Sequence, residues 1–598
     1  MTWDSDMAAY PRRWILRRSR PAQWRALQQE FDLHPLTAQL LFQRGFSDLE
    51  ELDTFLNPSL AKMHDPFLMK DMGRAVYEVL LALDGGQRIV IHGDYDVDGI
   101  CSVSVLYSFL RALGANVSYF IPTREQNGYG IAEPTVRRLA QDGNDLLIST
   151  DCGVSNVDEI ALARELGMRV VVVDHHTVPE ILPPANAILN PLQRDCNFPF
   201  KQLAAVGVTF NFVVALRKEL RSRGVFAHVK EPDIRALLDL VAMGTIADVM
   251  PLVGENRIFV RSGLEILGSK KRPGIAALLE RIGRPESQVN TETVSYGIAP
   301  RLNAAGRIGD ASICVELLTT RSYQRALQLA ERLDAMNRRR QEVERGILDE
   351  ALAKAQAEVD LERKILLIAG VDWPGGVLGI VASRLTERYH RPAIIVSIQD
   401  GVARGSARSI EGFDILDLLR QSDPLLSTYG GHTAAAGLSF AADNLEALRD
   451  ALNQSANVVL KTSGLPTPQI VLDGSVELGD LDERFVRDLA RLAPFGMANA
   501  EPIFLAEHTI ASRARVVGSD HLRARFRDDT AALDAIGFSL ADRQPLLSSA
   551  VAIAFSPRHS TFRGRARLEM HLRDIRSAVN NQADEVFDAL ESHDAPND

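Results

Sequence analysis

Three aspartates at alternate positions, Asp94, Asp96 and Asp98, follow a short apolar run in the stretch RIVIHGDYDVDG. Carboxylates this close repel one another unless a cation neutralises them, so the spacing indicates a divalent metal site. An EF-hand loop also begins D-x-D-x-D-G, but it needs a glutamate where this chain has Val105 and a helix, not a strand, before it. The spacing therefore favours a strand that delivers acids to the carboxyl edge of an open α/β sheet, where such sheets bind ligands.

Two more predicted strands end in ionisable residues. From about residue 80 to 320 strand-like and helix-like segments alternate, which is typical of βαβ units and a parallel sheet. Asp151 follows one strand, and the triplet Asp174, His175 and His176 follows the next. Because parallel strands place their carboxyl ends at one edge, we expect these groups to converge on a shared metal centre. The four strand-like runs are 89–92, 117–121, 146–150 and 169–173.

Two later segments have two interpretations each. Asp248 follows a helix-like segment, 232–244, and is either a helix cap or a further metal ligand. The stretch PRLNAAGR, 300–307, surrounds small residues with Arg301 and Arg307. It is either a backbone that approaches a phosphate closely or a turn flanked by surface arginines.

Residues 322 to about 358 are predicted to form one long helix, since apolar residues recur there at three- and four-residue spacing. At 1.5 Å per residue such a helix is about 55 Å long and can bridge two domains. A coiled-coil dimer is the alternative, but Arg338, Arg339 and Arg340 interrupt the apolar seam. A second α/β segment follows at about 360–455, in which GSARS (405–409) and GGHTAAAG (430–437) predict glycine-rich turns that offer N–H groups to anions.

After a linker-like stretch at 461–469, residues 470 to about 576 have the pattern of an all-β module. Residues 505–576 contain twelve Arg and no Lys against eight Asp or Glu. Arg523, Arg525 and Arg527 alternate, so a strand places them on one face. A small barrel with a basic face is typical of an oligonucleotide-binding (OB) fold, and a solvated strand face is the alternative. The acidic tail, 577–598, is expected to be at least partly disordered.

Composition limits the function classes. A chain of 598 residues with 46% hydrophobic and 24% charged residues is an ordinary globular protein of three or four domains. Four widely spaced cysteines, no membrane-length apolar run and no signal-like N-terminus predict a cytoplasmic protein without membrane contact. The net charge of −11 argues against coating of nucleic acid but allows a local basic groove. Near the N-terminus, arginines interleaved with Trp14 and Trp24 either bind single strands or pack as an arm.

The chain resembles the DHH phosphoesterase superfamily because it contains seven of its motifs in the same order. They are DYDVDG (94–99), TDCG (150–153), DHH (174–176), GTIAD (244–248), GGVLGIVASR (375–384), GSARS and GGHTAAAG. The resemblance runs from about residue 80 to 575 and includes APFGMANAEPIF (493–504) in the β-module. It is closest to the bacterial single-strand-specific 5′→3′ DNA exonucleases. It implies an α/β fold in which a DHH domain with a parallel sheet and a DHH-associated domain are joined by a long helix, followed by an OB-like barrel.

The resemblance assigns roles to individual residues. It makes Asp96, Asp98, Asp151, His175 and Asp248 ligands of two Mn²⁺ or Mg²⁺ ions, with Asp151 bridging and Asp94 a weaker ligand or a supporting residue. Histidine 176 is expected to contact the scissile phosphate and to protonate the leaving group, whereas His92 receives no assigned role. The resemblance also implies that phosphates are held by Arg124, Arg307, Ser406 and Arg408. The further predicted substrate-binding residues are Arg301, Asn303, His432, Arg523 and Arg525.

The chemistry also follows from the residue types. Carboxylates with one or two imidazoles suit Mn²⁺ or Mg²⁺, and two such ions activate water and stabilise an in-line displacement at phosphorus. The predicted function is a two-metal exonuclease that degrades single-stranded DNA from its 5′ end to nucleoside 5′-monophosphates in DNA repair and recombination. A pocket for the 5′ phosphate, formed by Arg124, Ser406 and Arg408 between the two α/β domains, is expected to set the polarity.

Two rival functions are considered. An oligoribonuclease or cyclic-dinucleotide phosphodiesterase of the same superfamily is typically shorter and lacks the barrel, and a scaffold without catalysis would not need every ligand. Single-stranded DNA is the predicted partner of a monomer, with single-strand-binding protein and a repair helicase as further candidates. The expected divisions are an N-terminal arm (1–79), the DHH domain (80–321), the connecting helix (322–359), the DHH-associated domain (360–460), the OB-like domain (466–576) and the acidic tail (577–598).

Overall fold

The structure, a computed structural model, describes residues 12–18, 21–123, 130–283, 289–463, 466–562, 565–578 and 585–587. The chain forms two compact units. The central unit comprises Asp53–Glu342 and Ala493–Ala500, and the flanking unit comprises Met1–Leu52, Val343–Leu492 and Glu501–Asp598. The short second segment of the central unit is held in part by the backbone, since the Leu252 N–H donates to the Met497 carbonyl at 2.8 Å.

The central unit is built on a sheet in which all five strands are parallel, in the order β3-β2-β4-β5-β6. This confirms the predicted parallel sheet, and β6 is a short edge strand that the sequence pattern did not predict. The strands are β2 (Ile89–Gly93), β3 (Val117–Phe120), β4 (Leu146–Thr150), β5 (Arg169–Val173) and β6 (Ala187–Leu189).

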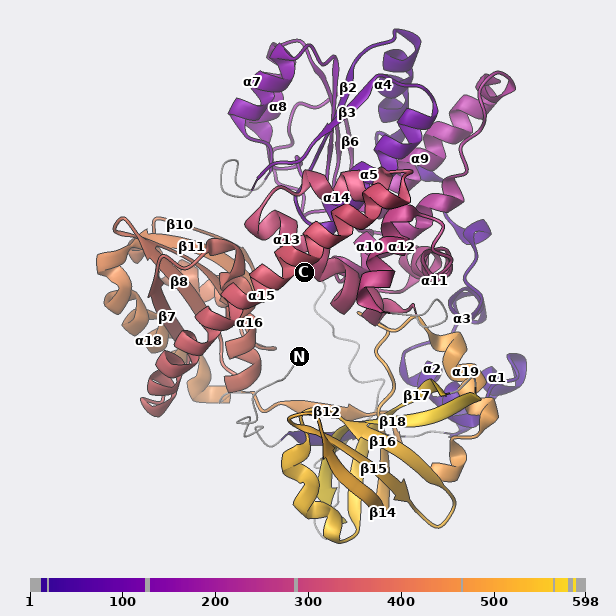
Figure 1. Ribbon diagram of the computed structural model, residues 1–598, viewed down its shortest axis with the longest axis vertical. Helices are drawn as coiled ribbons and strands as arrows, with labels where there is room; N and C mark the ends of the chain where they lie inside the picture. The colour runs from indigo at the N-terminus through magenta and orange to yellow at the C-terminus, as the bar shows by residue number, and fades with distance from the viewer. Residues whose placement is uncertain are drawn as a thin grey trace. The chain divides into compact units, whose positions relative to one another are not determined.

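Helices cover both faces of this sheet (Figure 1). Alternate residues of each strand point to opposite faces, so that Val90 packs with α7 (Glu133–Gln141) and α8 (Val157–Glu165), while Ile91 packs in the larger core on the other side. That larger core also contains α4 (Met72–Asp84), α5 (Val97–Ala112), α9 (Ala205–Ser222), α10 (Leu238–Ala247), α11 (Gly254–Gly268), α12 (Pro273–Ile282) and α14 (Ser312–Thr319).

For the segment 300–307, the interpretation as a turn flanked by surface arginines is wrong, whereas a close approach to a phosphate stays a prediction. The segment lies in α13 (Ala299–Ile308), which follows the π-helical segment η6 (Thr293–Ile298). Alanine, leucine and arginine are good helix formers, and Pro300 lies at the start of the helix, where its fixed backbone angle is favourable. A Cβ at Gly306 would lie 2.5 Å from the Tyr95 carbonyl oxygen, so the glycine allows close packing on the DYDVDG loop.

The predicted long helix is present as α15 (Tyr323–Asp360) and has 38 residues. The boundary between the two units falls within it, between Glu342 and Val343. Its first half contributes Leu329 and Leu333 to the core of the central unit, and its second half contributes Ile347 and Ala351 to a core of the flanking unit. Apolar residues at helical spacing along its whole length therefore have partners in both units.

The second α/β region has a mixed five-stranded sheet, in the order β10-β11-β9-β8-β7. The glycine-rich stretches predicted as turns are strands instead, and a hairpin turn at 433–434 joins β10 to β11. A Cβ at Gly431 would lie 2.3 Å from the Ala435 carbonyl oxygen, so glycine is needed for this close pairing. The elements are β7 (Leu366–Val371), α16 (Gly375–Tyr389), β8 (Ala393–Gln399), β9 (Val402–Arg408), α17 (Ile415–Gln421), β10 (Thr428–His432), β11 (Ala435–Ala441) and α18 (Leu445–Ser463).

The predicted barrel is confirmed as a closed ring of five strands, in which β14 pairs with both β15 and β17. Phe504, Phe526 and Phe555 are fully buried, as expected for the inward face of a small barrel. The strands are β14 (Phe504–Val517), β15 (His521–Arg527), β16 (Ala532–Gly537), β17 (Val551–Phe562) and β18 (Arg565–Ser577), with β13 (Gly474–Ser475) paired to β14.

A three-stranded sheet in the flanking unit contains the N-terminal strand β1 (Arg13–Arg17), between β12 (Gln469–Leu472) and β19 (Glu585–Phe587). Trp14 is fully buried, and its indole N–H donates to Asp574 at 2.9 Å. Packing is therefore the correct interpretation for Trp14, and part of the predicted acidic tail is a strand. The remaining helices of this part of the chain are α1 (Pro21–Glu30), α2 (Pro35–Gln43), α3 (Leu49–Leu56) and α19 (Glu483–Leu492).

Among the residues that the structure describes, no helix is both long enough and apolar enough to cross a membrane.

Candidate metal centre

The DYDVDG loop joins β2 to α5 at the carboxyl edge of the central sheet. Asp96 is the N-cap of α5, and its carboxylate accepts the Gly99 N–H at 3.0 Å. A Cβ at position 99 would lie 2.7 Å from the Asp94 backbone nitrogen, so only glycine allows the loop to fold back this tightly. The tight turn brings three carboxylates to one place, of which Asp94 and Asp98 are buried.

Asp151 follows β4 in an unusual backbone conformation. Its φ is +64°, in the left-handed region that aspartate and asparagine tolerate better than most residues, and its N–H donates to the Val173 carbonyl at 2.9 Å. The residue is 2% exposed. This local strain directs the carboxylate over the sheet edge toward the neighbouring strand end.

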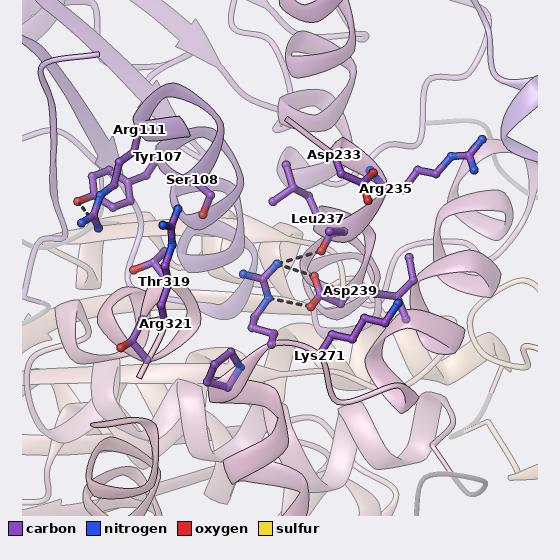
Figure 2. A pocket seen from close by; sticks show the side chains of 15 residues that line it. Tyr107, Ser108, Arg111, Asp233, Arg235, Leu237, Asp239, Lys271, Thr319 and Arg321 are labelled. Carbon is purple, nitrogen blue, oxygen red and sulfur yellow. Dashed lines mark hydrogen bonds and ion pairs between the residues drawn. The ribbon is translucent and has the colours of Figure 1, made fainter. Parts of the chain in front are cut away.

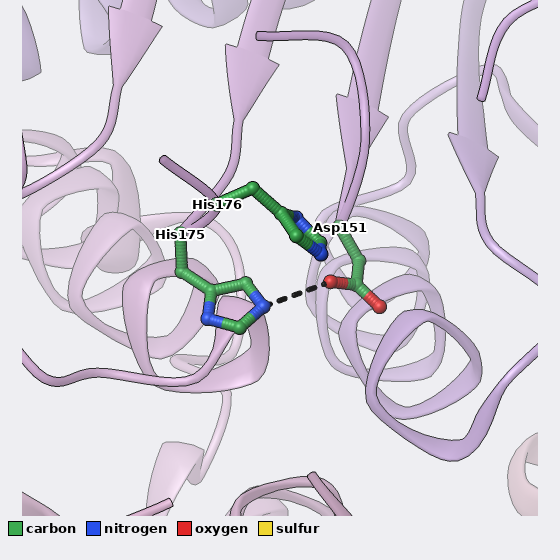
Figure 3. Close-up of side chains that lie close together, drawn as sticks. All are labelled: Asp151, His175 and His176. Atoms are coloured by element: carbon green, nitrogen blue, oxygen red, sulfur yellow. Dashed lines mark ion pairs between the residues drawn. The ribbon is translucent and has the colours of Figure 1, made fainter. Parts of the chain in front are cut away.

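The next strand end contributes two histidines that Asp174 holds in place. One carboxylate oxygen of Asp174 accepts the backbone N–H groups of His175 and His176 at 2.8 and 3.2 Å and contacts His176 Nδ1 at 2.7 Å. The other oxygen accepts the Val154 N–H at 3.0 Å. Figure 3 shows the two imidazoles and the Asp151 carboxylate directed toward one another.

The structure brings the six predicted metal ligands together. His175 Nε2 lies 3.3 Å from Asp151, 3.6 Å from Asp248 and 3.9 Å from Asp98, measured to carboxylate oxygens. Three sets of ligand atoms lie within 4.8 Å of one another: Asp94 with Asp96 and Asp151, Asp98 with His175 and Asp248, and Asp151 with His175 and His176. Asp151 and His175 each belong to two of these sets, so the sets adjoin one another and the ligands can hold two neighbouring cations.

The electrostatics of the cluster fit a divalent cation. Burial, with the adjacent charge of Asp96, raises the pKa of Asp98 to about 7. Burial and the charge of Asp98 raise the pKa of Asp248 to about 7, and burial with the charges of Asp96 and Asp98 holds the pKa of Asp151 well above its usual value. Burial lowers the pKa of His175, which keeps its imidazole neutral and able to ligate. Hard oxygen donors with a neutral imidazole suit Mn²⁺ or Mg²⁺.

Histidine 176 differs from its neighbour in charge. Burial opposes its protonation, but the hydrogen bond and the charge of Asp174 outweigh this and raise the pKa of His176 to about 9. Its side chain is 40% exposed. The imidazole is therefore a cation at neutral pH that can donate a proton to an anion at the cluster.

Sequence reasoning missed three supporting features. The α9 N-terminus positions Asp98, whose two oxygens accept the Ala205 and Val206 N–H groups at 2.7 and 2.9 Å. No local pattern near residue 205 indicates this contact. A Cβ at Gly244 would lie 2.8 Å from an Asp98 oxygen, so the glycine of GTIAD allows α10 to approach this carboxylate. The positioning role of Asp174 could have been found, because it begins the D-H-H triplet.

His92 belongs to none of the three ligand sets found in the described part of the chain. It is fully buried, packs on Phe120 and has Nδ1 3.6 Å from Cys152 Sγ. Burial lowers the pKa of His92 to about 4, so it is neutral at physiological pH. These contacts are those of a core residue of β2.

The predicted phosphate-binding residues of the central unit have different environments. Arg124 lies outside the described residues. Arg301, Asn303 and Arg307 all lie on α13. The guanidinium of Arg301 donates to Asp334 and to the Gly297 carbonyl, at 2.9 and 2.8 Å, so an intramolecular partner already occupies it.

In the flanking unit, Ser406 and Arg408 lie on the same face of β9. A Cβ at Gly379 of α16 would be 2.8 Å from an Arg408 guanidinium nitrogen and 3.5 Å from the Ser406 hydroxyl. Gly379, the third glycine of GGVLGIVASR, therefore makes room for both side chains. His432 ends β10 and is exposed.

On the barrel, β15 carries Arg523, Arg525 and Arg527 on its outer face, as the alternation predicted. Two of them have acidic neighbours, with Arg523 3.4 Å from Glu569 and Arg525 3.2 Å from Asp534.

Three family models match the chain. The N-terminal domain of the DHH family matches residues 88–245, the DHHA1 domain matches 363–457, and the RecJ OB domain matches 472–574. The single-stranded-DNA-specific exonuclease RecJ of Haemophilus influenzae is 36% identical over 553 residues, which cover 90% of this chain and 95% of that protein. RecJ of Bacillus subtilis is 37% identical over 90% of this chain and 67% of its own length.

Solved structures show the same fold. RecJ from Thermus thermophilus in complex with Mn²⁺ superposes with a TM-score of 0.80 at 31% identity, covering 94% of this chain and 79% of that one. A second structure of that protein, in complex with Mg²⁺, has a TM-score of 0.73 at 29% identity over 94% of this chain and 78% of that one.

Proposed function

Because the chain belongs to the RecJ family, we propose that it is a metal-dependent exonuclease that degrades single-stranded DNA from the 5′ end to nucleoside 5′-monophosphates. The observation that carries this proposal is the convergence of Asp94, Asp96, Asp98, Asp151, His175 and Asp248 from four separate stretches of sequence. The raised pKa values of three of these carboxylates are best explained by a site evolved to hold cations.

We assign the metal-holding role to these six residues as two adjacent groups, Asp94, Asp96 and Asp151 in one and Asp98, His175 and Asp248 in the other. Two bound Mn²⁺ or Mg²⁺ ions would neutralise phosphate charge and favour attack by water. The α9 N-terminus fixes Asp98, and the backbone at φ +64° directs Asp151. The ligands are thus preorganised by contacts that do not depend on the substrate.

His176 is the proposed general acid. Asp174 holds its Nδ1 at 2.7 Å, which leaves Nε2 to contact the scissile phosphate and to give a proton to the departing oxygen. A pKa of about 9 keeps that proton in place at neutral pH. The chemistry uses no covalent intermediate with the protein.

Substrate-holding roles follow from charge and position. We propose that Ser406 and Arg408 hold a phosphate of the strand, since a guanidinium takes a phosphate bidentately and the hydroxyl lies beside it on β9. Arg307 and the exposed arginines of β15 are proposed to contact further phosphates. The barrel would hold the strand electrostatically, without reading its sequence.

The test is degradation of three labelled substrates with Mn²⁺: 5′-labelled single-stranded DNA, 5′-labelled single-stranded RNA and an internally labelled cyclic dinucleotide. The proposal expects rapid release of mononucleotides from the 5′ end of DNA only. Preferential cleavage of RNA or of the cyclic dinucleotide would instead identify an oligoribonuclease or a cyclic-dinucleotide phosphodiesterase. Absence of all hydrolysis, with DNA binding retained, would indicate a scaffold.

Further aspects remain predictions from the sequence and the family. They are a cytoplasmic location, a monomeric state, a role in DNA repair and recombination, and cooperation with single-strand-binding protein and a repair helicase. Four buried free thiols, at Cys101, Cys152, Cys196 and Cys314, are compatible with a reducing compartment.

A further inference from the structure

A cavity of about 540 Å³ lies in the central unit at the ends of several helices. Its walls come from the C-terminal turn of α5, the residues that lead into α10, the link between α11 and α12, and the residues that follow α14. Figure 2 shows Tyr107, Ser108 and Arg111 on one side and Asp233, Arg235 and Leu237 on the other. A volume of this size is typical of sites for small ligands.

The cavity has an excess of positive charge. Arg111, Arg235, Lys271 and Arg321 line it and are exposed, and none of the four is ion-paired with an acidic residue in the part of the chain that the structure describes. Elsewhere in this unit exposed cations commonly have such partners, as Arg137 has Glu133 at 2.8 Å. Four unneutralised cations around one hollow repel one another, so an anion there would be stabilising.

The floor of the cavity is rigid and electrically neutral. Arg272 binds Asp239 through two nitrogens, at 2.7 and 2.9 Å, and donates to the Leu318 and Ala236 carbonyls at 2.8 and 3.0 Å. Asp239 is 2% exposed, and the guanidinium of Arg272 neutralises its charge. The remaining carboxylate in the lining is Asp233, which leaves the wall with a net charge of +3.

This cavity is distinct from the metal centre. Asp98 and Tyr107 are nine residues apart on α5, and Asp239 and Asp248 are nine residues apart across α10, so each helix separates the two sites by about 14 Å. Buried Cys101 lies between them, since the charges of Asp98 and of Asp239 both act on its thiol. A ligand in the cavity is thus not the phosphate that reacts at the metals.

We propose that this cavity binds the phosphate group of a small anion, either a free nucleotide or inorganic pyrophosphate. The four cations supply charge, and the hydroxyls of Ser108 and Thr320 supply further donors. Walls from four separate segments favour a compact ligand over a continuous DNA strand. The proposal is independent of the nuclease activity and goes beyond it.

The test is calorimetric titration of the full chain in EDTA with thymidine 5′-monophosphate, pyrophosphate and thymidine. Without metal the acidic cluster repels phosphate, and comparison of the pocket variant with its control separates binding in the cavity from binding at the other proposed phosphate contacts. The pocket variant is Lys271→Ala/Arg321→Ala, and the matched control is Arg74→Ala/Arg137→Ala, which removes the same charge from exposed positions outside the cavity. Should the pocket variant fail to fold, Arg111→Ala/Arg235→Ala replaces it.

We expect the wild type to bind one equivalent of the monophosphate or of pyrophosphate, and thymidine not at all. Whichever of the two compounds binds more tightly shows whether the ligand is a free nucleotide or inorganic pyrophosphate. The pocket variant should bind roughly tenfold more weakly for each charged hydrogen bond removed, and the control should bind like the wild type. No binding of either phosphate below millimolar concentration, equal weakening in the control, or binding of long single strands alone would overturn the proposal.

Discussion

The metal centre and the basic face of the barrel present their charges in opposite ways. At the metal centre, Asp98 and Asp151 are almost completely buried, and each is fixed by backbone contacts that originate far away in the sequence. On β15, Arg523 and Arg525 are 48% and 41% exposed, come from one strand and have one acidic neighbour each. The first site concentrates like charge where water cannot screen it, and the second spreads charge where water can.

This difference separates chemistry from binding. A buried cluster of like charges is costly without its cations, so each member is essential and the effects of substitutions are large. Each exposed arginine contributes a small, salt-sensitive amount to the free energy of DNA binding. Substitutions there should therefore weaken binding in proportion to the number of charges removed. Substitutions in each region test whether this contrast holds.

The largest effect is expected from Asp151→Asn, which should lower the hydrolysis rate by at least about a thousandfold, as removal of one member of a catalytic cluster often does. Asparagine tolerates the φ of +64° at this position, so the fold should be kept. Single-strand binding should be nearly unchanged. Initial rates and binding titrations are measured beside Asp158→Asn, an exposed acid on α8, which should behave like the wild type. Substantial Mn²⁺-dependent turnover by Asp151→Asn would contradict the assignment.

A smaller effect is expected from Asp174→Asn, which removes the charge that raises the pKa of His176 to about 9. Without it, the pKa of His176 should fall toward its ordinary value of about 6.5, because burial lowers it and only the charges of Asp248 and Asp98 remain to raise it. A general acid works while it is protonated, so the alkaline limb of the pH–rate profile should move to lower pH. At pH 8 the protonated fraction would fall about thirtyfold. A profile measured from pH 5 to 10 that keeps its alkaline limb near 9 would exclude His176 as the acid.

Next in size is the effect of Arg408→Ala on the choice of DNA end. If Arg408 and Ser406 hold a terminal phosphate, the variant should lose about tenfold or more of the preference for 5′-phosphorylated over 5′-hydroxyl single strands, the cost of one charged hydrogen bond. Initial rates on the two substrates give the ratio, and Arg420→Ala, an exposed arginine of the same unit, is the control. A variant that keeps the full preference would show that Arg408 binds elsewhere on the strand.

The convergence of the metal ligands could be predicted because the rule behind it is local. Each acid follows a recognisable strand, and parallel strands share an edge, so Asp94, Asp151 and His175 had to meet. The long helix could also be predicted from the sequence, since its apolar spacing continues through both halves. In both cases short-range patterns contained the information.

Other features depend on contacts between segments that are far apart in sequence. Strand β1 pairs with β12 and β19, and nothing near Trp14 indicates these partners. The glycine-rich stretches around Ser406 and Gly431 have low strand propensity, yet they form strands because neighbouring backbones approach closely enough to require glycine. The contact of the α9 N-terminus with Asp98 could not be predicted from the sequence for the same reason. Tertiary packing, not local preference, decides each of these.

The smallest effect is expected on the barrel, from Arg523→Ala/Arg525→Ala/Arg527→Ala. For each phosphate of a single strand that the variant no longer neutralises, the dependence of log affinity on log salt should flatten by about 0.7. Glu569 and Asp534 already compete for two of these arginines, so the total change should lie between about 0.7, for Arg527 alone, and about 2 for all three. Binding titrations at several salt concentrations measure the slope, and rates on very short oligonucleotides should not change, because the metal centre is untouched. The control Arg74→Ala/Arg137→Ala/Lys218→Ala removes the same charge from exposed, acid-paired positions of the central unit. If the two triple variants flatten the slope equally, the effect is one of net charge, and the arginines of β15 are an ordinary solvated face.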